Sequence, residues 1–165
     1  SNTKLYVADK GARLYHRSLY VYWKRTSPHP MMTLFDAPSR ESSCVRRSRT
    51  NTSLQSLGLL NETQRVEMAR VLAGRLLREA KDDDGRLDLL FGLLASRDPN
   101  PRERAACRRL LEVMTARYAK SPRDAQALLS TGASPRDARL NTTAHAAWAQ
   151  LAVTVLASDV AILLY

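Results

Sequence analysis

The stretch WKRTSPHPMMTLFDAPSRESSCVRRSRTNTSLQSLGLLN, residues Trp23–Asn61, decides how this chain is organised. It holds three of the seven prolines, a methionine pair and a cluster of arginines, whereas the sequence after it has ordinary helical periodicity. Pro28 and Pro30 exclude a continuous helix, because each restrains the residue before it and lacks a backbone donor. We therefore predict an ordered loop over residues 24–51 and a helical bundle over residues 52–165.

The remaining composition predicts one all-α domain. A chain of 165 residues with 44% hydrophobic content fits a single domain over 1–165, and the polar residues 1–13 are expected to form a lead-in. Apolar runs stay short of the roughly 20 residues that cross a bilayer, so no transmembrane segment is predicted. Helix-start signals recur and no alternating strand pattern is clear. The predicted fold is an irregular multi-helix bundle with a long Pro/Arg-rich ordered loop near the N-terminus.

Capping signals place the first helices of the bundle. Asn51 or Thr52 is expected to cap a helix that ends near Asn61. Asn61 can then cap a helix to about Ala80, with Gln64 completing a capping box. The predicted core stripe of that helix is Val66, Ala69, Ala73, Leu76 and Leu77. Its Arg/Glu-rich face is expected to be solvated.

The later helices have similar signals. Asp84 is the expected cap of a helix that buries an apolar stripe from Leu87 onward. Asn100, followed by Pro101 and Glu103, predicts a capping box and a helix to about Ala119. Two further helices are expected from Pro122 through Leu129 and from Asn141 onward, with Ser158 and Asp159 interrupting the last one. For YHRSLYVYWKR, residues 15–25, a short helix is favoured over a buried strand.

The net charge of +10 is concentrated at the start of the chain. Residues 1–50 carry ten Lys/Arg against three Asp/Glu, or +7, while residues 51–165 carry sixteen against thirteen, or +3. Such a surface favours anionic partners. Nucleic acid is the least favoured of these, because the aromatic residues lie apart from the main arginine run and no stacking motif is present. An acidic protein face and an acidic or sulfated glycan remain as candidate partners.

Two hypotheses describe the loop's charged residues. In the first, a ligand-binding set for an anion forms at the start of the helix after the loop, from Arg40, Arg46, Arg47, Arg49 and Asn51. In the second, a structural network or alternative site, in which the acids pair with these arginines, involves His29, Asp36 and Glu41. Carboxylates beside arginines stay ionised, which argues against a raised-pKa acid.

Motifs for catalysis or metal binding are missing from the sequence. No nucleophile elbow, P-loop, dinucleotide glycine pattern or HExxH motif occurs. Cys44 and Cys107 form no CxxC pair, and the aspartates at 82–84 lack the spacing of a calcium loop. No catalytic residue and no metal site is predicted, and the cysteines are expected to be free thiols, with a single disulfide as the alternative.

Three segments, FDAPSRE (35–41), RRSRTNT (46–52) and LGLLNETQRVEMAR (57–70), carry a family resemblance. The chain resembles the C-terminal domain of unknown function of planctomycete-type cytochrome c domain-containing proteins. It departs at Ser53, where members usually have proline. The resemblance implies a C-terminal fragment of a large, exported, multidomain protein at the periplasm or cell surface. It implies haem only in upstream domains, with no cofactor in these residues, and it names no activity.

The resulting hypothesis is a helical module that is non-catalytic alone. Its Arg-rich loop would dock the upstream domains of the same polypeptide or an anionic, glycan-like ligand. The alternative is that the module contributes residues to a redox or carbohydrate-processing active site shared with those upstream domains.

Overall fold

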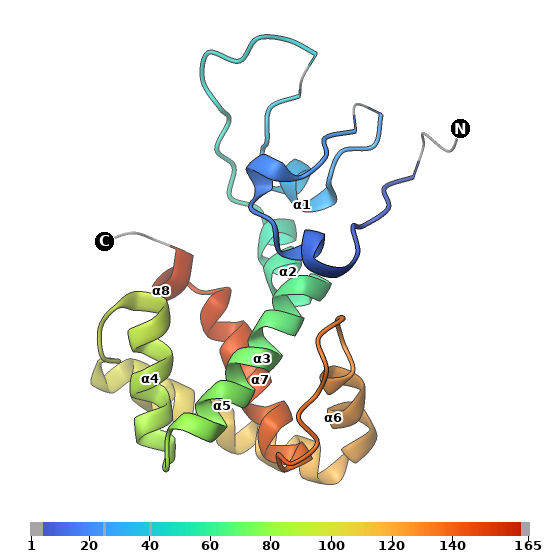
Figure 1. Cartoon of the computed structure of the whole chain (residues 1–165). Coiled ribbons are helices and arrows are strands. Elements are labelled where there is room, and N and C mark those ends of the chain that lie inside the picture. Colours follow the sequence, from blue (N-terminus) through green and yellow to red (C-terminus); the bar gives the residue numbers. More distant parts are fainter. Residues whose placement is uncertain (1–4, 25, 40, 163–165) are drawn as a thin grey trace. The chain divides into compact units, whose positions relative to one another are not determined.

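The computed structural model describes residues 5–24, 26–39 and 41–162, and in these ranges the regular secondary structure is helical, without strands (Figure 1). The predicted all-α fold is confirmed. The chain separates into two compact units, an N-terminal unit, Ser1–Gly58, and a C-terminal unit, Leu59–Tyr165. The boundary falls within helix α2, Ser53–Asn61. The single-domain organisation stays a prediction.

The first part of the N-terminal unit is extended backbone with two 3-10 turns, Gly11–Tyr15 and Ser18–Tyr20. Of the predicted short helix over residues 15–25, the described residues 15–24 include the 3-10 helix Ser18–Tyr20 and no α-helix, and Arg25 lies outside them. The physical reason is exposure. The side chains of Leu19 and Tyr22 are 84% and 78% exposed, so a helix here would have no apolar face to bury, and short helices depend on such packing.

Helix α1, Pro30–Leu34, meets α2 through Leu34 in the N-terminal unit. The Nδ1 atom of His29 accepts a hydrogen bond of 3.2 Å from the backbone N–H of Met31 and so caps α1. The close approach to α2 is made at Gly58, where a Cβ atom would collide with a methyl group of Leu34. The paired prolines therefore lead into one helical turn, whose Leu34 meets Gln55 and Gly58 of α2.

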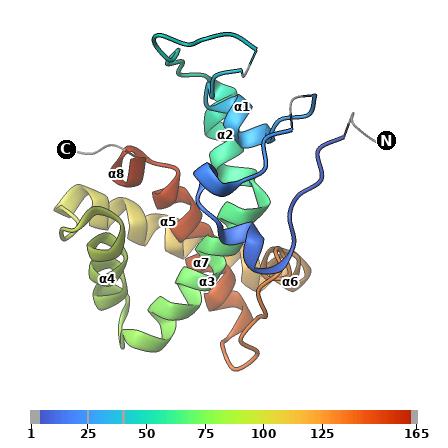
Figure 2. The same ribbon diagram turned by 45° about the horizontal axis from the view of Figure 1, so that its top comes forward.

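The C-terminal unit is a bundle built around α7, Thr142–Leu156. Helices α3, Thr63–Glu79, α5, Pro101–Lys120, and α6, Pro122–Leu129, contact α7, as the two views in Figures 1 and 2 show. Helix α4, Asp83–Ala95, contacts α3 and the short helix α8, Asp159–Ile162. The most deeply buried apolar side chains come from these helices and include Ala73, Leu76, Leu87, Leu90, Ala125, Ala146, Ala147 and Ala152.

Most helix starts follow the predicted signals. Asn100 and Glu103 form the predicted capping box of α5, and Asn141 caps α7 by accepting from the N–H of Ala144 at 3.0 Å. The break at 157–158 before α8 also agrees with the prediction. The predicted stripe of α3 is confirmed, with Ala69, Ala73 and Leu76 buried and Val66 and Leu77 partly buried.

Two capping predictions are wrong. Asn61 is the last residue of α2, and Glu62 caps α3 instead, because its backbone is extended and its carboxylate accepts from the N–H of Arg65 at 2.9 Å. Asp82 rather than Asp84 caps α4, accepting from Gly85 at 2.8 Å. In both places several neighbouring residues could serve as a cap, and the choice depends on the backbone between the helices.

The Arg/Glu-rich face of α3 was expected to be solvated, which is wrong at Glu67 and Arg70. Their exposed fractions are only 3% and 1%. They are buried by the segment between α6 and α7, which the sequence presents as a polar turn. Among the described helices, none has the length and hydropathy that a membrane span requires.

Candidate functional site

The arginine loop, defined here as residues 37–49, is closed at its two ends by Asp36 and Thr50. The backbone N–H of Thr50 donates to Oδ2 of Asp36 at 2.8 Å, and the Thr50 hydroxyl donates to the same oxygen at 2.7 Å. The hydroxyl bond, followed by the N–H bond, holds the pKa of Asp36 below its ordinary 3.8. Asp36 has a left-handed backbone with φ 55, a conformation that aspartate tolerates better than most residues. These bonds therefore hold the two ends of the loop together.

The start of α2 is tied to this closure through Gln55, which is 7% exposed. Its Nε2 atom donates to the Thr50 hydroxyl and to the backbone oxygen of Leu34, both at 2.9 Å. Its Oε1 atom accepts from the N–H of Thr52 at 3.0 Å, and its own N–H donates to Oγ1 of Thr52 at 3.3 Å. Thr52 is thus the capping residue, one of the two predicted. This capping box engages N–H groups that an anion at the helix start would otherwise bind.

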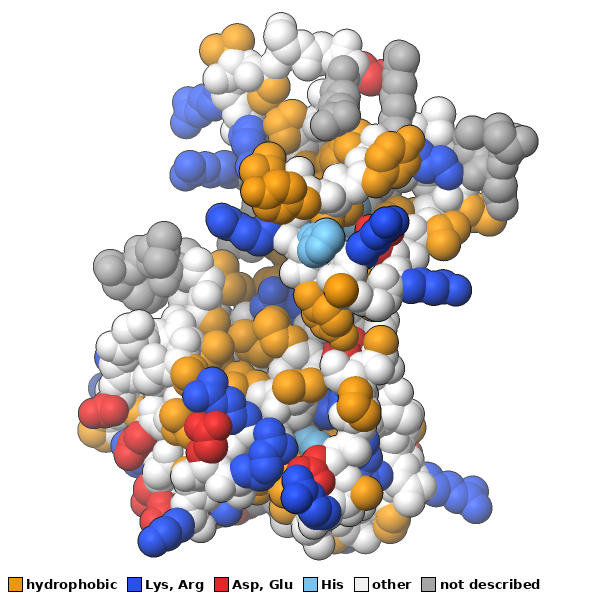
Figure 3. All heavy atoms as spheres, in the orientation of Figure 1, with side chains coloured by type: hydrophobic (Ala, Val, Ile, Leu, Met, Phe, Trp, Pro, Cys, Tyr) orange, Lys and Arg blue, Asp and Glu red, His pale blue; other side chains and the backbone are white. Residues whose placement is uncertain are grey.

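The predicted ligand-binding residues lie on the surface of the N-terminal unit. Arg46, Arg47, Arg49 and Asn51 are exposed, and Arg40 lies outside the described residues. Within the described part of the chain, no acidic side chain lies at salt-bridge distance from these three arginines. Figure 3 shows Lys and Arg side chains of this unit projecting from its surface.

The residues of the structural-network hypothesis lie at different places in the N-terminal unit. The direct partner of Asp36 is Thr50, and Arg47 acts on Asp36 only through its charge, which lowers the pKa of that carboxyl further. Glu41 is exposed. His29 caps α1, and its ring also meets the Tyr6 ring edge-on, with centroids 4.9 Å apart. The structure therefore anchors the loop through threonine and glutamine side chains.

A buried polar network that sequence reasoning missed lies in the C-terminal unit. The guanidinium of Arg70 donates to the backbone oxygens of Thr131, Ser134 and Pro135 at 3.3, 2.7 and 3.4 Å. The carboxylate of Glu67 accepts from the N–H of Ser134 at 2.6 Å. The two side chains thereby satisfy the backbone of the segment between α6 and α7. In the sequence of that segment, only Gly132 is of a type that indicates a close approach by another part of the chain. No sequence pattern indicates which residue approaches it.

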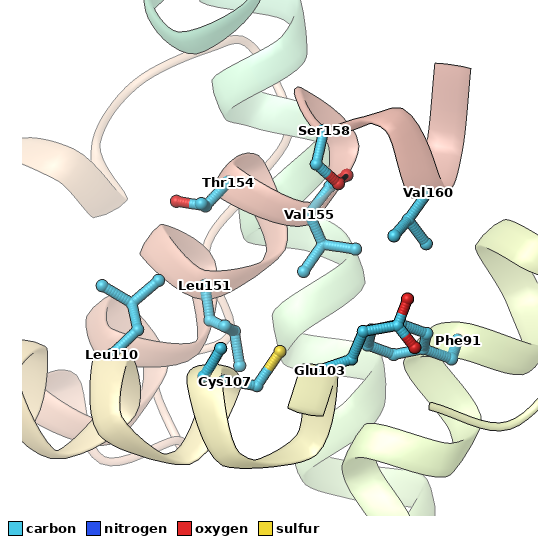
Figure 4. A pocket seen from close by; sticks show the side chains of 10 residues that line it. Phe91, Glu103, Cys107, Leu110, Leu151, Thr154, Val155, Ser158 and Val160 are labelled. Carbon is cyan, nitrogen blue, oxygen red and sulfur yellow. Dashed lines mark hydrogen bonds between the residues drawn. The ribbon is translucent and has the colours of Figure 1, made fainter. Parts of the chain in front are cut away.

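An apolar pocket of about 190 Å³ lies in the C-terminal unit between α4, α5, α7 and α8. Figure 4 shows Phe91 of α4, Cys107 of α5, and Leu151 and Val155 of α7 around it. Burial, and then the charge of Glu103, raises the pKa of the Cys107 thiol above its ordinary 9.0. The thiol is therefore protonated at neutral pH and presents an uncharged surface.

Cys107 and Cys44 are both free thiols, the first buried and the second exposed. Over the described ranges, no group of three or more His, Cys, Asp or Glu side chains is placed to hold a metal ion together. Among the described residues, the basic arginine loop and the apolar pocket are two candidate ligand-binding sites.

These observations define an all-α protein with a basic loop and a helical core. The chain belongs to the family described as PSD1, protein of unknown function (DUF1553), whose model matches residues 1–111. The match includes the arginine loop and α1 to α4, and it ends within α5. This assignment confirms the resemblance to a domain of unknown function. Searches of curated proteins and of solved structures find no match to the chain.

Proposed function

We propose that this chain is a docking module, without a reaction of its own, in a larger exported protein that also carries cytochrome c domains. The observation that supports this proposal is the arginine loop. Arg46, Arg47 and Arg49 expose guanidinium groups that have no acidic side chain at salt-bridge distance among the described residues, on a loop closed by Asp36 and Thr50. Guanidinium groups bind carboxylates and sulfates in a bidentate manner. The partner is an acidic face on the upstream domains of the same polypeptide.

The charge and exposure of the whole N-terminal unit support a docking role. Residues 1–58 carry ten Lys/Arg against three Asp/Glu, a net charge of +7. Among the described residues of this unit only Gln55 is buried, while large apolar side chains such as Leu5, Val7 and Val45 are 61%, 76% and 102% exposed. A segment with exposed apolar groups and unpaired positive charge gains stability by covering both with one partner.

A sulfated glycan is the second candidate partner, and the tyrosines favour it. Tyr15, Tyr20 and Tyr22 are 59%, 71% and 78% exposed in the same unit as the arginine loop. Flat amphipathic rings of this kind suit packing against sugar rings, while arginines suit the sulfate groups.

The experiment compares two triple variants of equal charge change. R46Q/R47Q/R49Q neutralises the arginine loop, and R102Q/R109Q/R123Q neutralises three exposed arginines of the C-terminal unit. Binding of the upstream part of the parent polypeptide, supplied as a separate protein, is measured by calorimetry at low and at physiological salt. We expect the loop variant to lose at least tenfold in affinity and the control variant to keep it. Equal losses would assign binding to net charge and contradict a loop site.

A parallel titration with a sulfated oligosaccharide and its unsulfated form separates the two partners. Binding of the sulfated form alone, without binding of the upstream domains, would favour the glycan. Binding of neither would contradict the docking function. The alternative of a shared active site is tested in the full-length parent, where R46A and E41A would lower turnover without changing stability.

A further inference from the structure

We propose that the pocket between α4, α5, α7 and α8 is a binding site for a small, uncharged, single-ring hydrophobic molecule. The site lies wholly within the C-terminal unit and does not depend on the docking function proposed above. Its volume is about 190 Å³. The pocket is open to solvent on one side, and its volume is comparable with the cavity of about 150 Å³ that binds benzene in another protein, so one ring with a short substituent fits in this space.

The walls of the pocket select an apolar molecule. Phe91, Leu110, Leu151 and Val155 supply aromatic and aliphatic surface from three helices, and Val160 of α8 adds to it (Figure 4). Burying the apolar surface of a ring against such walls is favourable by about 25 cal/mol per Å². The helices that carry these side chains also pack on one another, so the pocket is formed before a ligand arrives.

The polar residues of the lining have their hydrogen bonds directed elsewhere. The Thr154 hydroxyl donates to the backbone oxygen of Gln150 at 2.9 Å, and the Ser158 hydroxyl donates to that of Val155 at 2.7 Å. A polar ligand that needs a donor therefore finds none among these hydroxyl groups.

Glu103 sets the charge at this pocket. Its carboxylate accepts from the guanidinium of Arg97 at 2.6 and 2.8 Å and from the N–H of Asn100 at 2.7 Å. These bonds, led by that from Arg97, lower its pKa, so the group is an anion at neutral pH. Because Arg97 already balances the charge of this carboxylate, the lining offers no free counter-charge to a ligand anion or to a ligand cation. Cys107, with a protonated thiol, adds polarizable apolar surface.

The test uses toluene as the probe, with benzoate and benzylammonium as charged molecules of similar ring size. Two alanine variants on α5 give a matched pair. Ala106 lines the pocket and Ala105 does not, and both are exposed positions in the same helix. A106L therefore places extra carbons at the pocket, whereas A105L makes the same chemical change outside it. Far-UV circular dichroism establishes that both variants are folded.

We expect toluene to raise the melting temperature of the wild type and of A105L in a saturable way, and to bind A106L at least tenfold more weakly. In a C44S background, toluene should also slow alkylation of Cys107 by a neutral maleimide at least threefold. The proposal is overturned if toluene produces no saturable shift and no protection. It is also overturned if A106L and A105L bind toluene equally, or if benzoate binds as tightly as toluene.

Discussion

The Nε2 atom of His145 lies 2.9 Å from the backbone oxygen of Arg70 in the interior of the C-terminal unit. Its other ring nitrogen, Nδ1, is buried without a hydrogen-bond partner in the described structure. A neutral ring with the proton on Nε2 can donate to that oxygen, whereas a second proton on Nδ1 would be buried without an acceptor. Burial first, and then the positive charges of Arg70, Arg136 and Arg78, lower the pKa of His145 below its ordinary 6.5.

This lowered pKa predicts a loss of stability in mild acid. Because the unfolded chain takes up a proton at His145 near pH 6.5 and the folded chain only at lower pH, the contribution is complete above pH 6.5. It is lost as the pH falls from 6.5 toward the folded pKa, at no more than about 1.4 kcal/mol per pH unit. Urea unfolding between pH 7.5 and pH 5 measures it. H145Q should remove this slope, and an unchanged slope would contradict the assignment.

Two glycines predict opposite effects of the same substitution. Gly132 has φ +92, and a Cβ there would collide with the side chain of Glu67, so G132A should destabilise by about 2 kcal/mol or more. Gly92 lies inside α4 with open space around its Cα, so G92A should stabilise by about 0.5–1 kcal/mol. Thermal unfolding of the two variants measures both effects. Similar shifts in one direction would contradict the placement of Gly132 against Glu67.

The closure of the arginine loop predicts a change in protease sensitivity. Glycine adopts a left-handed backbone readily, so D36G keeps the conformation and removes the carboxylate that accepts from Thr50, whereas the amide oxygen of an asparagine would still accept both bonds. We expect trypsin to cut after Arg46, Arg47 or Arg49 several-fold faster in D36G. The exposed Asp9 provides the control, because D9G changes the charge of the same unit equally. Equal cleavage rates for the two variants would show that the Asp36 bonds do not hold the loop.

The caps of α5 and α6 predict unequal costs for two similar truncations. Asn100 accepts from the N–H of Glu103 at 2.9 Å, so N100A should destabilise by about 1 kcal/mol. Ser121 precedes α6 in the same position, but its side chain makes no capping bond, so S121A should change stability by less than about 0.5 kcal/mol. Denaturant unfolding distinguishes the two. A loss at Ser121 equal to that at Asn100 would contradict the observed capping.

Local signals predicted much of the bundle. Asn100 with Glu103, Asn141, and the stripe of α3 concern contacts within a few residues, and there the sequence determines the outcome. The predictions were wrong where the environment of a residue depends on segments that are distant in the sequence. Glu67 and Arg70 look like a solvated face of α3, but they satisfy the backbone around Ser134, 64 to 67 positions away. No periodicity in α3 contains that information.

The candidate sites were predictable to a different degree. The exposure of the arginines follows from composition, because basic residues outnumber the acidic residues that could pair with them. The closure of their loop by Thr50 and Gln55 did not follow, because uncharged side chains carry no sequence pattern that would pair them with Asp36. The apolar pocket could not be predicted, because its lining residues come from four helices and the break before α8, and only the packing of these elements places them together.

The exposed thiol of Cys44 lies within the arginine loop, two residues before Arg46, whereas the thiol of Cys107 is buried. Thiol reagents in neutral buffer should therefore discriminate between the two without mutagenesis. A fluorophore attached to the natural sequence would sit beside the groups proposed to meet the partner. The protein thus provides its own reporter position, from which anisotropy or quenching can follow complex formation in real time.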